Sequence, residues 1–176
     1  MSKRQVLRGG IVLAAIFAVV VFAGSGSVMA PSNNCSHVGT FHGESGGATW
    51  IVSNSLGKGV TDGQMVVEWV SWDPTLSGGF PAVRTTNPMG VWEKVNEKIY
   101  KFTWVAYGLG ADGSVVYVAR ASGVSTTEDC DHLRFTFVME FFSPAQDISK
   151  DSPAFGCMSG EGTETRMLLV QATCTQ

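Results

Sequence analysis

Apolar and polar residues alternate with a period of two along most of the chain after residue 30. In residues 98–107, KIYKFTWVAY, the rings of Tyr100, Phe102 and Trp104 fall on one side, whereas Lys101 and Thr103 fall on the other. Residues 132–142, HLRFTFVMEFF, repeat the pattern. No stretch after residue 30 keeps a helical period, so the chain is predicted to be all-β.

The same alternation places seven strands and a short eighth one near residues 38–42. The seven are residues 48–56, 63–72, 91–95, 98–107, 114–123, 132–142 and 163–172. Ala111-Asp112-Gly113 is a hairpin signal, and residues 95–98 and 126–131 are predicted to form two further turns. A meander of hairpins with one continuous apolar face must close on itself or pack against a second sheet. The predicted fold is therefore an antiparallel up-and-down barrel of seven to eight strands.

The interior of such a barrel is either filled by side chains or holds one small ligand. The large apolar residues that alternate into it are candidates for lining a binding pocket. They are Trp69, Tyr100, Phe102, Trp104, Phe135, Phe137, Met139 and Phe141. We expect Trp92 to close one end of the barrel, and the long segments 73–90 and 143–162 are candidate lids.

The first 30 residues have the three parts of a secretory signal. A basic stretch, MSKRQVLRGG, precedes the apolar run IVLAAIFAVVVFA and a small-residue exit, GSGSVMAPS. The apolar run is short for a membrane span. We therefore expect residues 1–30 to be a signal peptide, with an uncleaved membrane anchor as the alternative, and residues 31–176 to be a single secreted or periplasmic domain.

Net charge narrows the choice of partner. The full chain has a formal charge of −3, and removal of Lys3, Arg4 and Arg8 with the signal leaves nine basic against fifteen acidic residues, a charge of −6. This balance disfavours nucleic acid or an anionic membrane surface as the main partner. Membrane contact is expected only through an uncleaved N-terminal segment.

All four cysteines lie in the exported part, which predicts disulfides rather than a metal site because no CxxC pair is present. Four cysteines allow three connectivities. If strand 132–142 pairs antiparallel with strand 163–172, Cys130 lies near Cys174, and Cys35 is left to pair with Cys157. That pairing is our hypothesis.

Charged residues within strands are the candidates for chemistry. A carboxylate inside an apolar barrel has a raised pKa and can act as a general acid or base. Glu68, in MVVEWV, is the first candidate for a polar group inside the cavity, and Glu140 the second, with Tyr107, Tyr117 or Arg120 as a neighbouring donor. Such residues more often mark the solvent face, and for Glu140 that interpretation is favoured.

Other functional motifs are weak. His37 and His42 are five residues apart, which puts them on opposite faces of a strand, so we predict no metal there. Nucleophile-elbow and phosphate-loop contexts are absent, and no cofactor is expected.

Gly90-Val91-Trp92, the tyrosine–phenylalanine strand after it, the Asp-Gly hairpin, and the late glutamate before a Ser-Pro exit, Glu140–Pro144, are similar to features of small secreted bacterial lipocalin-like (calycin-like) barrels. The resemblance covers roughly residues 63–170. It implies an interior cavity and a binding role, and it transfers no catalytic residue.

The leading hypothesis is an exported barrel that binds a small apolar or aromatic molecule in its interior. The alternatives are a cyclase, isomerase or dehydratase that uses acid–base chemistry on the same barrel, and a structural or adhesive envelope domain without a ligand.

Overall fold

A computed structural model describes residues 35–71, 81–149 and 153–168, all of which belong to the compact unit Pro31–Gln176. These residues form nine strands and no helix, which confirms the all-β prediction. The strands are β1 (Gly39–Ser45), β2 (Ala48–Leu56), β3 (Asp62–Ser71), β4 (Arg84–Thr85), β5 (Met89–Lys94), β6 (Ile99–Leu109), β7 (Val115–Thr127), β8 (His132–Phe142) and β9 (Gly156–Arg166). No helix in the described part is long and apolar enough to span a membrane.

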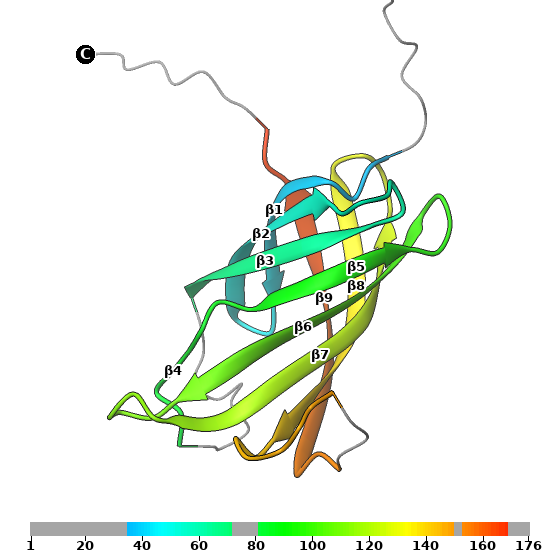
Figure 1. The fold of residues 1–176 in the computed structure, drawn as a ribbon. Helices are drawn as coiled ribbons and strands as arrows, with labels where there is room; N and C mark the ends of the chain where they lie inside the picture. The colour runs from blue at the N-terminus through cyan, green and yellow to red at the C-terminus, as the bar shows by residue number, and fades with distance from the viewer. Residues whose placement is uncertain (1–34, 72–80, 150–152, 169–176) are drawn as a thin grey trace, which may run out of the picture. The chain divides into compact units, whose positions relative to one another are not determined.

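Eight of the strands close into an antiparallel up-and-down barrel (Figure 1). β1 pairs with β2, β2 with β3, and β3 with β5. From β5 to β9 each strand pairs with the next, and β9 pairs back with β1. The short β4 is an extra strand that lies along the end of β6 beyond β5. Closure leaves the apolar face of the sheet inside, as the alternating sequence pattern requires.

The predicted turns form as expected. At the hairpin between β6 and β7, Gly113 has a φ of 83°, and Asp112 Oδ1 accepts hydrogen bonds from the backbone N–H and the hydroxyl of Ser114. Asn96 organises the β5–β6 turn because its Oδ1 accepts from the backbone N–H groups of Lys98 and Ile99. The third turn joins β7 to β8.

One end of the barrel is packed shut, in agreement with the prediction for Trp92. The indole of Trp92 is 3% exposed and meets the rings of Tyr100 and His37 edge-on, and His37 stacks on Tyr100 with 4.5 Å between centroids. Arg166, at the end of β9, lies over the ring of Phe41 with its guanidinium carbon 4.6 Å from the centroid. Its guanidinium also donates to backbone carbonyls of the segment that precedes β1 and of the β7–β8 turn. We call this region the closed end.

The predicted disulfide pairing is wrong, because Cys35 bonds to Cys130 across the closed end. The pairing hypothesis depended on a strand at 163–172, but β9 ends at Arg166 and places Thr165 opposite His132. The neighbour of Cys130 is therefore the segment before β1, with 4.5 Å between the two Cα atoms. Cys157 on β9 has a free, exposed thiol, and Cys174 lies outside the described residues. Disulfides of this kind form in oxidising compartments.

The second predicted lid is also partly wrong. Residues 156–162 belong to β9 and form barrel wall, because they pair with β8 from Phe141 to Phe135. Of the first predicted lid, residues 73–80 lie outside the described residues, whereas β4 and the start of β5 lie within it.

Candidate functional site

The barrel encloses a cavity of about 320 Å³. This volume falls at the lower end of the range for small-molecule sites. Most of its wall is apolar side chains that point inward from β2, β3, β6, β7, β8 and β9. These are Trp50, Trp69, Phe102, Trp104, Tyr117, Phe135, Phe137, Phe141, Met65, Met139 and Met158.

The structure brings seven of the eight predicted pocket residues to this wall: Trp69, Phe102, Trp104, Phe135, Phe137, Met139 and Phe141. Tyr100 is the exception. Its ring packs beneath the cavity at the closed end, and its hydroxyl donates to the carbonyl of Cys35 at 3.2 Å. Tyr100 therefore closes the barrel and does not line the cavity.

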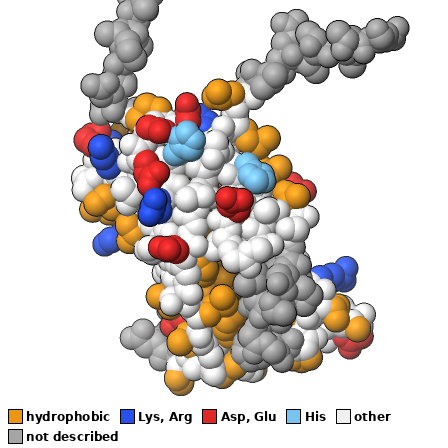
Figure 2. Space-filling model, turned by 180° about the vertical axis from the view of Figure 1, so that it is seen from behind, with side chains coloured by type: hydrophobic (Ala, Val, Ile, Leu, Met, Phe, Trp, Pro, Cys, Tyr) orange, Lys and Arg blue, Asp and Glu red, His pale blue; other side chains and the backbone are white. Residues whose placement is uncertain are grey.

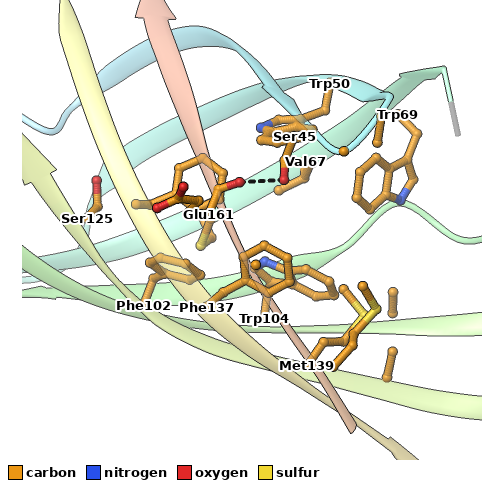
Figure 3. A pocket seen from close by; sticks show the side chains of 18 of the residues that line it. Ser45, Trp50, Val67, Trp69, Phe102, Trp104, Ser125, Phe137, Met139 and Glu161 are labelled. Atoms are coloured by element: carbon orange, nitrogen blue, oxygen red, sulfur yellow. Dashed lines mark hydrogen bonds between the residues drawn. The ribbon is translucent and has the colours of Figure 1, made fainter. Parts of the chain in front are cut away.

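The rings contact one another without filling the barrel. Trp50 meets Trp69 and Phe135 edge-on at 5.8 and 5.7 Å between centroids, and Trp69 meets Trp104 at 6.4 Å. Figure 3 shows Trp50 and Trp69 on one side of an open space, with Phe102, Trp104 and Phe137 on the other. Edge-to-face contacts of this kind hold rings in fixed orientations, so the wall of the cavity is preorganised.

The cavity reaches the surface near the β1–β2 turn. Exposed residues of this turn and of β9 line it there, among them Gly46, Ser159 and Glu161. Within the described chain, β9 pairs with β1 only from Thr163 to Arg166, so its first half has a partner on the β8 side alone. The Ser45 hydroxyl donates to the Glu161 carbonyl at 2.6 Å and ties the turn to β9 at the edge of this opening (Figure 3).

The outer wall differs in character from the interior. Figure 2 shows acidic, basic and histidine side chains gathered on the upper part of the face opposite to that of Figure 1, with hydrophobic side chains visible lower down. Among the exposed charged residues are Glu44 on β1, Glu128 in the β7–β8 turn, and Arg134 on β8. The outer face is therefore mixed, because exposed apolar side chains such as Val66, Val70 and Val91 share it with the charged ones.

A buried carboxylate, that of Glu164, lines the cavity. Glu164 is 9% exposed, and its Oε1 accepts a hydrogen bond from Trp50 Nε1 at 3.1 Å. The two residues meet across β1 because Gly43 lies between them in the sheet, paired with Trp50 on one side and with Glu164 on the other. A Cβ at Gly43 would overlap the indole of Trp50, so only glycine leaves space for this contact.

Burial raises the pKa of the Glu164 carboxyl from 4.5 to about 7, and the Trp50 hydrogen bond offsets part of the increase. The side chain is therefore protonated in a large fraction of molecules at neutral pH. A carboxyl group in this state can either donate a hydrogen bond or accept one.

Further polar residues line the cavity, among them His37, Asn54 and Ser125. His37 Nε2 pairs with Asn54 Nδ2 at 3.3 Å, and burial, followed by the positive charge of Arg166, lowers the pKa of His37 to about 4. His37 is therefore neutral at pH 7. Within the described chain, Asn54 Oδ1, Ser125 Oγ, His37 Nδ1 and Trp69 Nε1 are buried and have no hydrogen-bond partner in the protein.

The two carboxylates predicted from sequence lie outside the barrel. Glu68 is exposed on the outer face of β3, because Met65, Val67 and Trp69 take the inward positions. Glu140 lies on the outer face of β8. There its Oε2 accepts a hydrogen bond from Nη2 of Arg120, on β7, at 2.8 Å. The prediction that either carboxylate faces the cavity is therefore wrong. Of the proposed donors, only Tyr117 lines the cavity.

Glu164 lies within the predicted strand 163–172, but the sequence did not mark which side of that strand faces inward. In GCMSGEGTETR the inward positions include Gly160, Gly162 and Glu164, so no apolar alternation marks the strand. The signal in the sequence was the pairing of small residues on this strand with large rings on the neighbouring strand. The glycines lie beside Phe137 and Phe135 of β8, and a Cβ on either glycine would contact the neighbouring ring.

The two histidines considered as possible metal ligands, His37 and His42, lie in different environments. His37 is buried at the closed end, and His42 is exposed on β1. Across the described ranges, no group of three or more His, Cys, Asp or Glu side chains could hold a metal ion.

No protein-family model matches the chain, and no curated protein or solved structure matches it either. The fold and the cavity are therefore the observations that bear on function.

Proposed function

We propose that this protein is an exported barrel that binds one small apolar or aromatic molecule in its interior. The observation that carries the proposal is the cavity, about 320 Å³ in volume, lined by rings and methionines and open near the β1–β2 turn. Binding sites for small molecules are concave and mostly apolar, with a few polar groups that orient the ligand. The carboxyl group of Glu164, which lines the cavity, is such a group.

Export is part of this proposal. It is supported by the signal-like residues 1–30 and by the Cys35–Cys130 disulfide, which is typical of secreted and periplasmic proteins. The acidic balance of the remaining chain supports a small molecule as the partner in preference to nucleic acid. An adhesive envelope domain would not need a cavity, so the cavity does not favour that alternative.

Binding of prodan, a neutral apolar dye that brightens on leaving water, tests the proposal. Ala119, on β7, is 3% exposed and lines the cavity. Ala119→Phe would fill part of the space, and we expect it to weaken prodan binding about tenfold or more, the cost of forcing a ligand out of a filled pocket. Val124→Phe adds the same ring to the outer face of the same strand and should leave binding unchanged.

Circular dichroism of each variant checks that it folds, and Ala106→Phe, at the opposite position on β6, replaces Ala119→Phe if needed. If wild type fails to bind prodan, or if a folded cavity-filled variant binds as well as wild type, interior binding is refuted.

The second candidate, an acid–base enzyme, is favoured by one observation. Glu164 has a pKa of about 7 and faces the cavity, as a general acid or base of such an enzyme would. Mass spectrometry of the molecule that copurifies with the natively expressed protein separates the two functions. A binder returns that molecule unchanged after incubation with fresh protein, whereas an enzyme converts it and Glu164→Gln does not.

A further inference from the structure

The charge of the cavity is one-sided. Glu164 lines its interior and Glu161 borders its opening, whereas in the described part of the chain no lysine or arginine lines it. The cation nearest to Glu164 along β9 is Arg166, but its guanidinium is engaged at the closed end by three backbone carbonyls and by the ring of Phe41. An anionic ligand would therefore enter an apolar space that offers a carboxyl group and no counter-ion.

The carboxyl group of Glu164 has spare hydrogen-bonding capacity. Among the described residues its one hydrogen bond is that from Trp50 to Oε1, whereas a carboxylate has about four acceptor positions on two oxygens. The free positions on this carboxyl group suit a ligand that carries several N–H donors.

The aromatic wall adds a second attraction for a positively charged group. Trp50 and Phe135 meet edge-on at 5.7 Å and Phe102 meets Phe135 at 6.3 Å, so ring faces as well as edges border the space next to Glu164. Ring faces attract cations, most strongly when water is excluded. Ring faces and a carboxylate together favour a ligand with a positively charged end group.

We propose that the ligand of this cavity is an aromatic or apolar amine in its protonated form, whose ammonium group binds to the Glu164 carboxylate. The proposal rests on the interior-binding function proposed above. Ammonium–carboxylate hydrogen bonds are charge-assisted and stronger than neutral ones, and the apolar remainder of the ligand occupies the space between Trp69, Trp104 and Phe137 (Figure 3).

The proposal makes binding dependent on pH. An ammonium group binds the ionised form of Glu164, so affinity is full above the pKa of the free carboxyl, about 7, and falls as the pH drops below it. Few other groups can contribute from the surrounding elements. β1 places Gly43 and Phe41 beside Glu164, β8 places Leu133 and Phe135, and β2 places Trp50. The remaining charged or titratable neighbours are Arg166, Glu161 and His37, and the last is neutral across this range.

Three ligands that share an indole ring test the inference by isothermal titration calorimetry. Tryptamine carries an ammonium group, tryptophol a hydroxyl, and indoleacetate a carboxylate. At pH 8 we expect tryptamine to bind about tenfold tighter than tryptophol, and indoleacetate to bind weakest. Below pH 7 the affinity for tryptamine should fall about tenfold per pH unit, whereas that for tryptophol should stay constant.

Matched variants assign the effect to Glu164. Glu164→Gln should remove the preference for tryptamine and leave tryptophol binding within about threefold. Glu68→Gln removes the same charge from the outer face of β3 and should keep the wild-type preference and pH profile.

The outcomes separate the two proposals. If tryptophol binds as tightly as tryptamine, or if Glu164→Gln keeps the preference, the amine inference is wrong and interior binding stands. If none of the three binds while prodan does, the amine inference fails in the same way. If neither the indoles nor prodan bind, the proposed function itself is refuted.

Discussion

Glu164 is a carboxyl group that the fold keeps in an apolar interior at a cost in stability. Its pKa is about 7 in the folded protein and 4.5 in the absence of burial. The folded state thus holds a proton that the unfolded chain releases between these pH values, and stability decreases as the pH rises from 4.5 to 7. His37 acts in the opposite direction, since its lowered pKa makes stability increase with pH between about 4 and 6.5.

Glu164→Gln removes the first of these two effects. Because the amide is neutral at every pH, we expect the variant to gain stability relative to wild type by about 3 kcal/mol between pH 4.5 and pH 7, with no further gain above. Urea denaturation across this pH range measures the difference. Glu68→Gln should give a curve parallel to that of wild type, and a gain from Glu164→Gln that does not change with pH would refute the buried, protonated state.

At the scale of elements, strands that present large side chains were predicted well, and the strand that presents glycines was not. The predicted ranges 48–56 and 132–142 coincide with β2 and β8, because large apolar residues recur at alternate positions along most of each strand. β9 was assigned to residues 163–172, where MLLV forms an apolar run, but the strand spans Gly156–Arg166. Tertiary pairing with the rings of β8 overrides the weak strand preference of glycine there.

This misassignment explains two other errors. It extended the second lid over barrel wall, and it suggested Cys174 as the partner of Cys130. The inward faces of β6 and β8 did not depend on it, and seven of eight pocket residues were predicted from their period alone.

The Cys35–Cys130 disulfide joins the segment before β1 to the β7–β8 turn, 95 residues further along the chain. It holds that segment on the closed end. Replacing both cysteines with serine should lower the free energy of unfolding by about 2–5 kcal/mol, because the unfolded chain gains conformational freedom. Urea denaturation measures the loss. Cys157→Ser, at the exposed free thiol, should change stability by less than about 0.5 kcal/mol. Equal stability of the double variant and wild type would contradict the assigned bond.

The barrel has a closed end and an open end. At the closed end Trp92, Tyr100 and His37 pack together, and Arg166 donates hydrogen bonds to backbone carbonyls. The β1–β2 turn and the first half of β9 border the open end. A glycine opposite a large ring recurs around the barrel, as at Gly123 beside Phe102. These pairs let the interior hold many rings in fixed positions and still leave a cavity, which side chains of uniform size would not achieve.

The central claim is that a small molecule binds inside this barrel, and the methionine methyl groups test it most directly. Met65, Met139 and Met158 line the cavity, whereas Met89 and Met167 are 66% and 51% exposed. In a carbon–proton spectrum of protein labelled at these methyls, titration with indole should shift the signals of Met65, Met139 and Met158, because an aromatic ring placed beside a methyl group changes its chemical shift. The signals of Met89 and Met167 should stay in place. Shifts at Met89 or Met167 without shifts at the three cavity methionines, or no shifts at any concentration, would contradict interior binding.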